Sequence, residues 1–543
     1  MPWTQAYAPV AGSVAASAGV AAVPLAVIFV CLALLRMRAH GAAILALASA
    51  LLIAVPVWGM PARLALLSAV HGAAFGLFPV FFIVLATLFL FNITVKSGQF
   101  EVIRASLADV TPDRRIQALL IAFCFGAFIE GAAGFGAPVA IAGATLAGLG
   151  FRPFYAAAIC LVANTAPVAF GTIGIPIVAM GGVMGLNEAG LMKLSAVVGH
   201  MLPIVSLIIP AYLVLIVAGL RKTVEVLPAV GACGCVFALL QWQVASRLGP
   251  YLPDLLASLG AMAALVVLLR FWRPRSVFRF EHDAPVPGSH GYTRSQVLRA
   301  WSPYLALTAI VLVWGAPPVK AVLNRTTLMI PVAGLDNAIS RPQPSATAAA
   351  IPAKFKLDYV ASGGSAVLVA ALFSALACGL SPRETARTFG RTLRDMRLPA
   401  VTIASVLALA YVMNASGMTP CLGLLSMRTG RLFPLISPVL GWIGVFLTGS
   451  DTSSNVLFGG LQKTAAEQLG INPLLTAAAN TSGGVMGKMI SPQSLAVACA
   501  ATGMVGSEGS LFRFTLRHSL LLLLLICVIT YLQAYCVCWV APA

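Results

Sequence analysis

The stretch Asn164-Thr-Ala-Pro-Val-Ala-Phe-Gly-Thr-Ile-Gly-Ile-Pro176 has a counterpart in the second half of the chain, Asn480-Thr-Ser-Gly-Gly-Val-Met-Gly-Lys-Met-Ile-Ser-Pro492. Both follow the spacing Asn-Thr-x5-Gly-x4-Pro, and the Asn-Thr pair occurs nowhere else in the sequence. Each copy is a polar, helix-breaking element inside an apolar run. Secondary transporters use such duplicated broken helices to form a substrate site near the bilayer midplane. The pattern therefore predicts a transporter built from two related halves.

The composition indicates a membrane protein. Of the 543 residues, 60% are hydrophobic and only 9% are charged, whereas soluble domains carry about 25% charged residues. Apolar stretches approaching the ~20 residues that a membrane-spanning helix needs recur along the whole chain. They are predicted at 20–36, 41–59, 78–95, 116–129, 195–219, 226–242, 254–272, 301–316, 359–380, 398–416, 431–449 and 518–541.

Four further segments are shorter or more interrupted, and they are interpreted as half-helices or re-entrant hairpins. They cover 130–149, 154–178, 452–469 and 473–490. The predicted fold is an all-α polytopic membrane protein with roughly 12–14 spans plus two re-entrant or broken-helix elements. These would form two related repeats, which we expect to be inverted.

Polar segments divide the chain. Residues 1–272 form an N-terminal membrane half that contains the first repeat at about 116–178. Residues 273–300 are predicted to be a cytoplasmic linker, and 301–543 form a C-terminal half with the second repeat at about 431–494. The Pro-, Ala- and Thr-rich segment 317–358 is predicted to be an exposed loop, and an extracytoplasmic location is one alternative for it.

The net charge of +18 is explained by membrane topology rather than by a nucleic-acid partner. Arginines gather in short connections, at 114–115, 270–299 and 383–397, and basic residues concentrate in cytoplasmic loops of membrane proteins. The almost uncharged N-terminus is then expected outside, and the first span would serve as the insertion signal. Segment 383–397 predicts a basic surface helix that lies against anionic lipid headgroups.

The run Phe128-Ile-Glu-Gly-Ala-Ala-Gly-Phe-Gly-Ala-Pro138 places a carboxylate, Glu130, beside helix-breaking residues. Broken backbone at membrane depth is tolerated only where it faces protein or a water-filled cavity. A charged carboxylate there costs several kcal/mol, so Glu130 is a candidate for binding and releasing a proton during transport. Alternatively, Glu130 only holds the broken helix through backbone hydrogen bonds. The residues expected to break the helix are Gly131, Gly134, Gly136 and Pro138.

The corresponding acid in the second copy is Asp451, within Thr448-Gly-Ser-Asp-Thr-Ser-Ser-Asn455. It is the second candidate for proton coupling. Asp451 could instead cap the helix that follows it. It could also bind a cation with the surrounding hydroxyl groups, because hard ions prefer oxygen ligands.

The two Asn-Thr pairs are predicted to bind substrate at the turns of two hairpins. A half-helix that begins beyond such a turn offers free N–H groups and a positive dipole end to a carboxylate. Packing between helices by small polar residues is the alternative. The predicted substrate-binding residues are Asn164, Thr165, Asn480 and Thr481, with Gly171 and Gly487 allowing close approach and Pro176 and Pro492 interrupting the following helices.

Lys488 is a lone basic residue in the second copy. It is predicted to bind an anionic substrate, or to pair with Glu130 or Asp451 across the two halves. Alternatively, its side chain extends to the membrane interface.

No sequence feature indicates an enzyme, a cofactor or a metal. The chain has no Gly-Lys-Ser/Thr phosphate-binding loop, which argues against an ATP-driven pump. Its eleven cysteines lie mostly within apolar spans and lack zinc-site spacing. An intramembrane enzyme would need a nucleophile–base pair, and neither a His pair nor a Ser–His arrangement occurs at helical spacing. Oligomeric state is not predicted.

Several of these runs closely resemble the bacterial L-lactate permease family, over about residues 78–530. The matching runs are 130–138, 164–171, 449–455, 461–464 and 487–494. The resemblance implies a proton-coupled carrier of L-lactate, often with D-lactate and glycolate, in the bacterial inner membrane. More distantly, the Asn-Thr pairs look like the Ser-Asn-Thr hairpin tips of divalent-anion:sodium symporters. Here Ala163 and Ala479 replace the Ser, which puts sodium binding at these positions in doubt.

The sequence thus favours a symporter that imports a small 2-hydroxy-monocarboxylate together with a proton. A sodium-coupled small-carboxylate symporter on the same scaffold is the alternative, and a passive channel is a third possibility. Uptake that requires a pH gradient, rather than sodium, would distinguish the first two.

Overall fold

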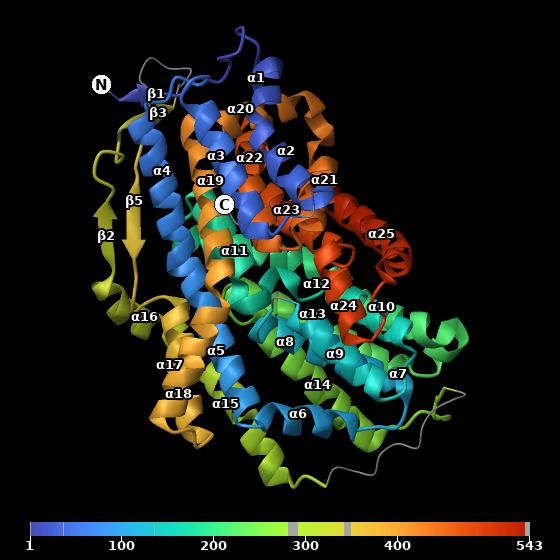
Figure 1. Cartoon of the computed structure of the whole chain (residues 1–543). Coiled ribbons are helices and arrows are strands. Elements are labelled where there is room, and N and C mark those ends of the chain that lie inside the picture. Colours follow the sequence, from blue (N-terminus) through green and yellow to red (C-terminus); the bar gives the residue numbers. More distant parts are fainter. Residues whose placement is uncertain (1, 36, 135, 281–290, 342–348, 538–543) are drawn as a thin grey trace.

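The computed structural model describes residues 2–35, 37–134, 136–280, 291–341 and 349–537, and most of them are helical (Figure 1). Within these ranges, 10 helices are long and apolar enough to cross a membrane, or 11 if one bent pair counts as a span. The polytopic helical fold is confirmed. Three further apolar helices have 10–17 residues: Ala39–Ala54, Ala137–Gly148 and Gly363–Ala377.

The first half contains helices that run from the N-terminus to the linker. Their bounds are α1 (Val14–Ala21), α2 (Val23–Phe29), η1 (Val30–Leu34), α3 (Ala39–Ala54), α4 (Ala62–Phe75), η2 (Gly76–Phe81), α5 (Phe82–Lys96), α6 (Gln99–Ala108), α7 (Arg114–Gln117), η3 (Ala118–Phe125), α8 (Gly126–Ala132), α9 (Ala137–Gly148), α10 (Pro153–Ala163), η4 (Val168–Phe170), α11 (Gly171–Met184), α12 (Glu188–Val224), α13 (Leu227–Arg247) and α14 (Pro253–Phe271).

The second half adds the remaining helices. Their bounds are α15 (Arg294–Gly315), α16 (Pro317–Leu323), η5 (Asn324–Thr326), α17 (Gly363–Ala377), α18 (Pro382–Asp395), α19 (Arg397–Ser416), α20 (Met418–Ser426), η6 (Met427–Leu432), α21 (Phe433–Thr448), α22 (Asp451–Leu469), α23 (Pro473–Lys488), α24 (Pro492–Ala501) and α25 (Glu508–Tyr535). Helices of the two halves pack together, α11 against α22 and α9 against α24.

Two small sheets occupy part of the segment that was predicted to be a loop. In one, β1 (Trp3–Thr4) pairs in parallel with β3 (Ile339–Arg341), which pairs with β4 (Ala349–Ile351). In the other, β2 (Leu328–Pro331) pairs with β5 (Lys354–Leu357), and both lie beside α4 (Figure 1). The sheets tie the N-terminus to this segment, so both are on the same side of the molecule. Sequence reasoning missed the strands.

The start of the linker is anchored by buried charge. The guanidinium of Arg115 bonds both Asp113 (2.7 Å) and Glu225 (3.0 Å) and donates to the carbonyls of Lys222 and Ser276. These contacts hold residues 276–278 against the connection between α12 and α13. Residues 281–290, in the middle of the predicted linker, lie outside the described residues, and so does Arg36.

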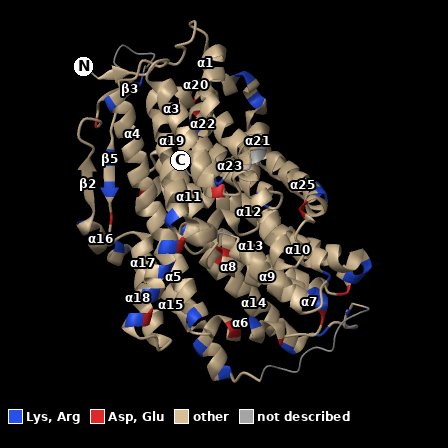
Figure 2. Cartoon of the chain, viewed as in Figure 1, with Lys and Arg blue, Asp and Glu red and all other residues tan. Residues whose placement is uncertain are grey.

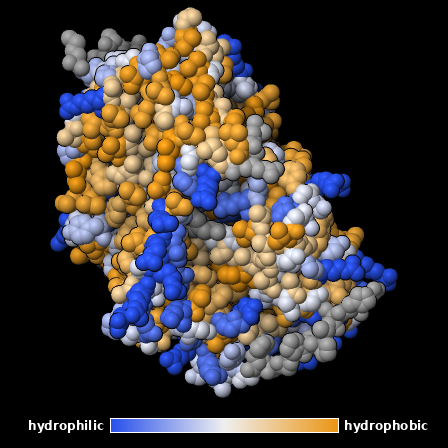
Figure 3. All heavy atoms as spheres, viewed as in Figure 1, coloured by the Kyte–Doolittle hydropathy of each residue, from blue (hydrophilic) through white to orange (hydrophobic). Residues whose placement is uncertain are grey.

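Much of the protein surface is apolar, as expected for helices that face lipid. Figure 2 shows few charged residues along the middle of the helices, and Figure 3 shows a broad apolar surface. The predicted basic surface helix forms as α18, which begins with a capping box between Ser381 and Glu384. Its arginines, Arg383, Arg387, Arg391 and Arg394, make it strongly amphipathic. A strip of hydrophilic side chains lies over this helix in Figure 3.

Candidate functional site

A cavity with a volume of about 290 Å³ lies between the two halves of the protein. The broken ends of helices from both halves line it, together with residues of α2, α3 and α19. Figure 3 shows a hollow with hydrophilic atoms around it near the middle of this face. The polar residues that line the cavity are His40, Glu130, Thr172, Thr402, Thr448, Ser450, Asp451, Thr452, Ser453, Lys488, Gln493 and Ser494.

The three charged residues predicted from the sequence all line this cavity. Nζ of Lys488 lies 3.5 Å from Oε1 of Glu130, and the two side chains are 12% and 3% exposed. The other carboxylate oxygen of Glu130 is buried and has no hydrogen-bond partner in the described structure. Glu130 comes from the first half and Lys488 from the second, so the ion pair crosses the interface between the halves.

The expected break beside Glu130 is present. Helix α8 ends at Ala132, and α9 begins only after Gly134 and Gly136, which both adopt left-handed backbone conformations. Pro138 lies in the first turn of α9, where the missing N–H group costs nothing. The break ends the helix next to the carboxylate, as the sequence predicts.

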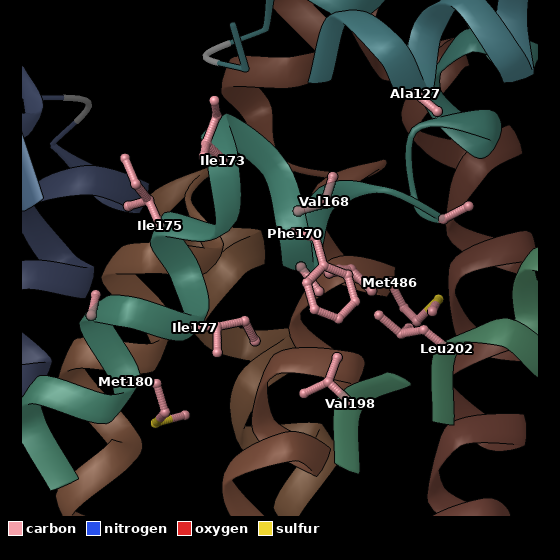
Figure 4. Packing of buried hydrophobic residues seen from close by; sticks show 14 of the residues in the cluster. Ala127, Val168, Phe170, Ile173, Ile175, Ile177, Met180, Val198, Leu202 and Met486 are labelled. Atoms are coloured by element: carbon pink, nitrogen blue, oxygen red, sulfur yellow. The ribbon is translucent and has the colours of Figure 1, made fainter. Parts of the chain in front are cut away.

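The start of α11 completes this wall with a strained turn. Three successive residues, Thr172, Ile173 and Gly174, have positive φ angles of 47°, 56° and 73°. For a residue other than Gly, this conformation costs about 1–2 kcal/mol. The isoleucine side chains of this turn and of the helix beyond it pack into the apolar core with Phe170 and Val198 (Figure 4). Packing therefore maintains a strained backbone that places Thr172 at the cavity.

Glycine is needed at position 171 because Glu130 lies directly against it. A Cβ atom added to Gly171 would lie 2.7 Å from Oε1 of Glu130. Pro176, which was expected to interrupt the following helix, lies within α11 just beyond the strained turn.

Asp451 is the first residue of α22 rather than its cap. The cap is Ser450, whose hydroxyl accepts a hydrogen bond from the backbone N–H of Ser453 at 3.2 Å. One oxygen of Asp451 accepts a long bond of 3.4 Å from Asn455, while the other is buried without a partner among the described residues. Asp451 therefore has one carboxylate oxygen that can interact with a molecule in the cavity.

The second Asn-Thr pair lies inside α23, which continues unbroken from Pro473 to Lys488. The prediction of a hairpin turn at this pair is wrong. Asn480 and Thr481 both donate to Oδ1 of Asn455 at 3.0 Å, and Gln462 donates to Oδ1 of Asn480 at 3.1 Å. The turn comes later, at 489–491, after Gly487 and before Pro492, which begins α24.

The first Asn-Thr pair does lie at a break, since Asn164 caps the end of α10. Helices α10 and α11 meet at a bend of 63°. The side chain of Asn164 is buried, and neither of its amide atoms has a partner in the described parts of the chain. Thr165 donates to the carbonyl of Val162 at 2.7 Å. Neither pair lines the described cavity, so direct contact of these four residues with substrate stays a prediction.

Sequence reasoning missed two residues near this site. His40 lines the cavity from the start of α3. Asp254 is 1% exposed, lies in the first turn of α14 and packs against Gly131, next to Glu130. The available signal for Asp254 was a lone acid at the start of an apolar span, which is the pattern of a functional residue in membranes. His40 offered no comparable signal.

The chemistry of the site suits a small anion and a proton. Lys488 offers a positive charge, and Glu130 and Asp451 offer two carboxylates that can each accept a proton. Hydroxyl and amide groups from Ser450 to Ser453 and from Gln493 surround these charges. Among the described residues, no group of three or more His, Cys, Asp or Glu is placed to hold a metal ion.

Among solved structures, the chain is similar to MtrF of Neisseria gonorrhoeae, which belongs to a class of antimetabolite efflux pumps. The TM-score is 0.46 at 14% identity, and the match covers 84% of this chain and 81% of MtrF. It is similarly close to the YdaH transporter of Alcanivorax borkumensis, with a TM-score of 0.44.

Sequence comparison is more specific. The family model for L-lactate permease matches residues 17–537. The chain is 49% identical to an L-lactate permease of Bacillus subtilis over the full length of both proteins. It is 46% identical to an L-lactate permease of Escherichia coli, covering 99% of this chain and 100% of that one. It is also 44% identical to the E. coli glycolate permease GlcA, covering 98% of each. The chain belongs to the L-lactate permease family.

Proposed function

We propose that this protein imports L-lactate, and also D-lactate and glycolate, by proton symport across the bacterial inner membrane. It moves these substrates without converting them chemically. The observation that carries the proposal is the Lys488–Glu130 ion pair, which crosses the interface between the halves inside the cavity. The names of the relatives, L-lactate permease and glycolate permease, support the substrate class.

The size of the cavity favours a small ligand. Pockets for drug-sized ligands measure about 300–1,000 Å³, and this cavity, at about 290 Å³, lies just below that range. A three-carbon hydroxy acid has few atoms and needs only a few directed polar contacts. Lys488 would bind its carboxylate, while the hydroxyl groups of Ser450 to Ser453 and the amide of Gln493 would bind its 2-hydroxyl group.

The ion pair suggests how substrate and proton are coupled. Without substrate, Lys488 is neutralised by Glu130. A lactate carboxylate that binds Lys488 takes over this role and leaves Glu130 buried without a counter-ion. A buried, unpaired carboxylate is costly, so Glu130 becomes neutral by accepting a proton. Lactate binding thus favours proton binding, and transport of one requires transport of the other.

Asp451 is the second proton-coupling candidate. It lies in the same cavity and has an oxygen without a described partner. Two carboxylates beside one lysine leave the site with an excess negative charge, which would repel an anionic substrate. We therefore propose that Asp451 is neutral when lactate binds.

The Asn-Thr pairs are proposed to support the site. In the second half, Asn480 and Thr481 hold Asn455, and Asn455 contacts both Asp451 and the carbonyl of Pro176 in the first half. In the first half, the amide atoms of Asn164 have no partner among the described residues and would bind substrate after a conformational change. Movement of the two halves that opens the cavity toward Asn164 would bring this about.

The test is uptake of labelled L-lactate into proteoliposomes under an inward proton gradient without sodium. We expect accumulation above equilibrium that a protonophore abolishes and glycolate reduces by competition. Accumulation that appears only after sodium is added would replace this proposal with the sodium-coupled alternative. Uptake that never exceeds equilibrium under either gradient would contradict active transport.

A further inference from the structure

Asp254 is a buried acid outside the cavity. Its side chain is 1% exposed, and neither carboxylate oxygen has a hydrogen-bond partner among the described residues. Buried polar atoms are nearly always hydrogen-bonded, so an unpaired pair of oxygens calls for an explanation. Its position in the first turn of α14 offers some stabilisation from the helix dipole. That effect does not require burial and leaves the absence of partners unexplained.

Asp254 packs against Gly131, the residue that follows Glu130. A Cβ atom added to Gly131 would lie 2.8 Å from Cβ of Asp254 and 3.4 Å from the backbone nitrogen of Leu255. Helices α8 and α14 therefore touch at the residue that follows Glu130. Glu130 also has one oxygen without a described partner.

Among the described elements that pack against α14, Glu130 is the one residue with a carboxyl group that could exchange a proton with Asp254. Besides α8, the elements packed against α14 are α13 and η3. Their ionisable residues are the thiols Cys124, Cys233 and Cys235 and the exposed Arg247 at the end of α13.

The chain just before α14 carries a tyrosine that leads toward the protein surface. Tyr251 lies three positions before Asp254, against Gly363 at the start of α17. The carboxylates of Asp358 and Glu188 act on Tyr251 electrostatically. Both reach solvent, with side chains 14% and 48% exposed, and both pair with lysines. Asp358 directly follows β5, so this group reaches the surface beyond the end of that strand.

We infer that Asp254 is a proton-transfer residue that connects Glu130 with the protein surface near Tyr251 and Asp358. Asp254 accepts a proton that arrives by way of Tyr251 and passes it to the ionised Glu130. Asp254 then becomes ionised and accepts the next proton from the same side. No proton is created or lost, and lactate does not contact Asp254. This inference rests on the proposed proton symport.

The test compares Asp254→Asn with the wild type in proteoliposomes, using two readouts. The first is the rate of lactate accumulation driven by a proton gradient. The second is exchange of labelled external lactate for unlabelled internal lactate without a gradient, which needs no net proton movement. Asn has nearly the same shape as Asp, but its amide group cannot accept a proton and release it again. Glu101→Gln, in an exposed pair with Arg104, is the matched control.

We expect Asp254→Asn to slow accumulation by about a hundredfold, the lower end of what a positioned proton-transfer group contributes, while exchange stays at the wild-type rate. Tyr251→Phe should slow accumulation in the same direction. Wild-type accumulation in Asp254→Asn would overturn the inference, and so would loss of exchange, because that indicates a structural or substrate-binding role. Failure of the wild-type protein itself to accumulate lactate with protons would instead overturn the proposed symport.

Discussion

At the scale of single residues, the site combines one positive and two negative side chains from different halves of the chain. Lys488 lies 3.5 Å from Glu130 and is 12% exposed, so it is less buried than its partner and faces the cavity. A cation in this position can exchange one carboxylate for another at small cost. Substrate affinity and proton coupling should therefore respond differently to changes at Lys488 and at the carboxylates.

Replacing Lys488 with Gln should weaken lactate binding. A hydrogen bond to a charged group contributes about 1.5–3 kcal/mol, so affinity should fall by about 10- to 100-fold. Competition of unlabelled lactate against labelled lactate in proteoliposomes measures this change. The control is Lys463→Gln, because Lys463 donates to the carbonyl of Met184 at 2.8 Å and does not line the cavity. Equal affinity in the Lys488 variant and the wild type would remove Lys488 from the substrate site.

Gly171→Ala should impair transport without preventing folding. The added Cβ would lie 2.7 Å from Oε1 of Glu130 and would push the carboxylate away from Lys488. We expect the rate of proton-driven uptake to fall by about tenfold or more, as often happens when a reacting group is displaced by about 1 Å. Gly231→Ala is the control, since its Cβ would have no neighbour within 4 Å. If both variants transport at the wild-type rate, the position of Glu130 is not critical.

At the scale of helices, the two Asn-Thr segments differ in where the helix breaks. In the first, α10 ends at the Asn-Thr pair and the chain bends by 63° before continuing in α11. In the second, α23 passes through the pair and ends only after Lys488. The difference places a lysine at the second break and a strained turn at the first. Asn455 in α22 links the two, because it bonds α23, Asp451 and the carbonyl of Pro176.

Asn455→Ala should therefore reduce both stability and transport. It leaves the buried side chains of Asn480 and Thr481 and the carbonyl of Pro176 without this partner, at about 1–3 kcal/mol for an unsatisfied group. Thermal unfolding in detergent and lactate uptake measure the two effects. Asn472→Ala removes an exposed cap of α23, which should cost about 1 kcal/mol and leave uptake unchanged. An Asn455 variant with normal uptake would show that these contacts serve folding alone.

Lowering the pH should detach the start of the linker, residues 273–280, from the connection between α12 and α13. Hydrogen bonds from Lys222, Ser276 and Arg115 lower the pKa of Glu225 from 4.5 to about 2. Because the folded-state pKa is depressed, the ionised carboxylate stabilises the folded protein above about pH 4.5, and this contribution is lost as the pH falls toward 2.

Hydrogen exchange of residues 273–280 between pH 7 and pH 3 tests this expectation. The wild type should lose protection as the pH falls, after correction for the intrinsic exchange rate, and Glu225→Gln should already be less protected at pH 7. Identical protection of the wild type and the variant at every pH would show that the linker is held by Asp113 and Arg115 alone.

At the scale of the whole molecule, composition and hydropathy were sufficient to predict a polytopic helical fold. The charges at the site could also be found, because an ionisable residue in an apolar segment is conspicuous. The strands were missed because four- and three-residue strands carry little periodicity.

The detailed roles of the Asn-Thr pairs could not be predicted, for a physical reason. A polar pair in an apolar segment needs hydrogen-bond partners, but the sequence does not say whether substrate or protein supplies them. Here Asn455 supplies them in the second half, while Asn164 in the first half remains unpaired within the described structure. Asp254 was missed because its relation to Glu130 depends on the packing of α8 against α14.

The most direct test of the account is a comparison of lactate exchange and proton-driven accumulation in the Glu130→Gln variant. Gln resembles a permanently protonated Glu130, so the variant should exchange labelled L-lactate at the wild-type rate. It should not accumulate lactate under an inward proton gradient, whereas the wild type and the surface control Glu101→Gln should. Full accumulation by Glu130→Gln would contradict the central claim that this carboxylate couples lactate movement to the proton.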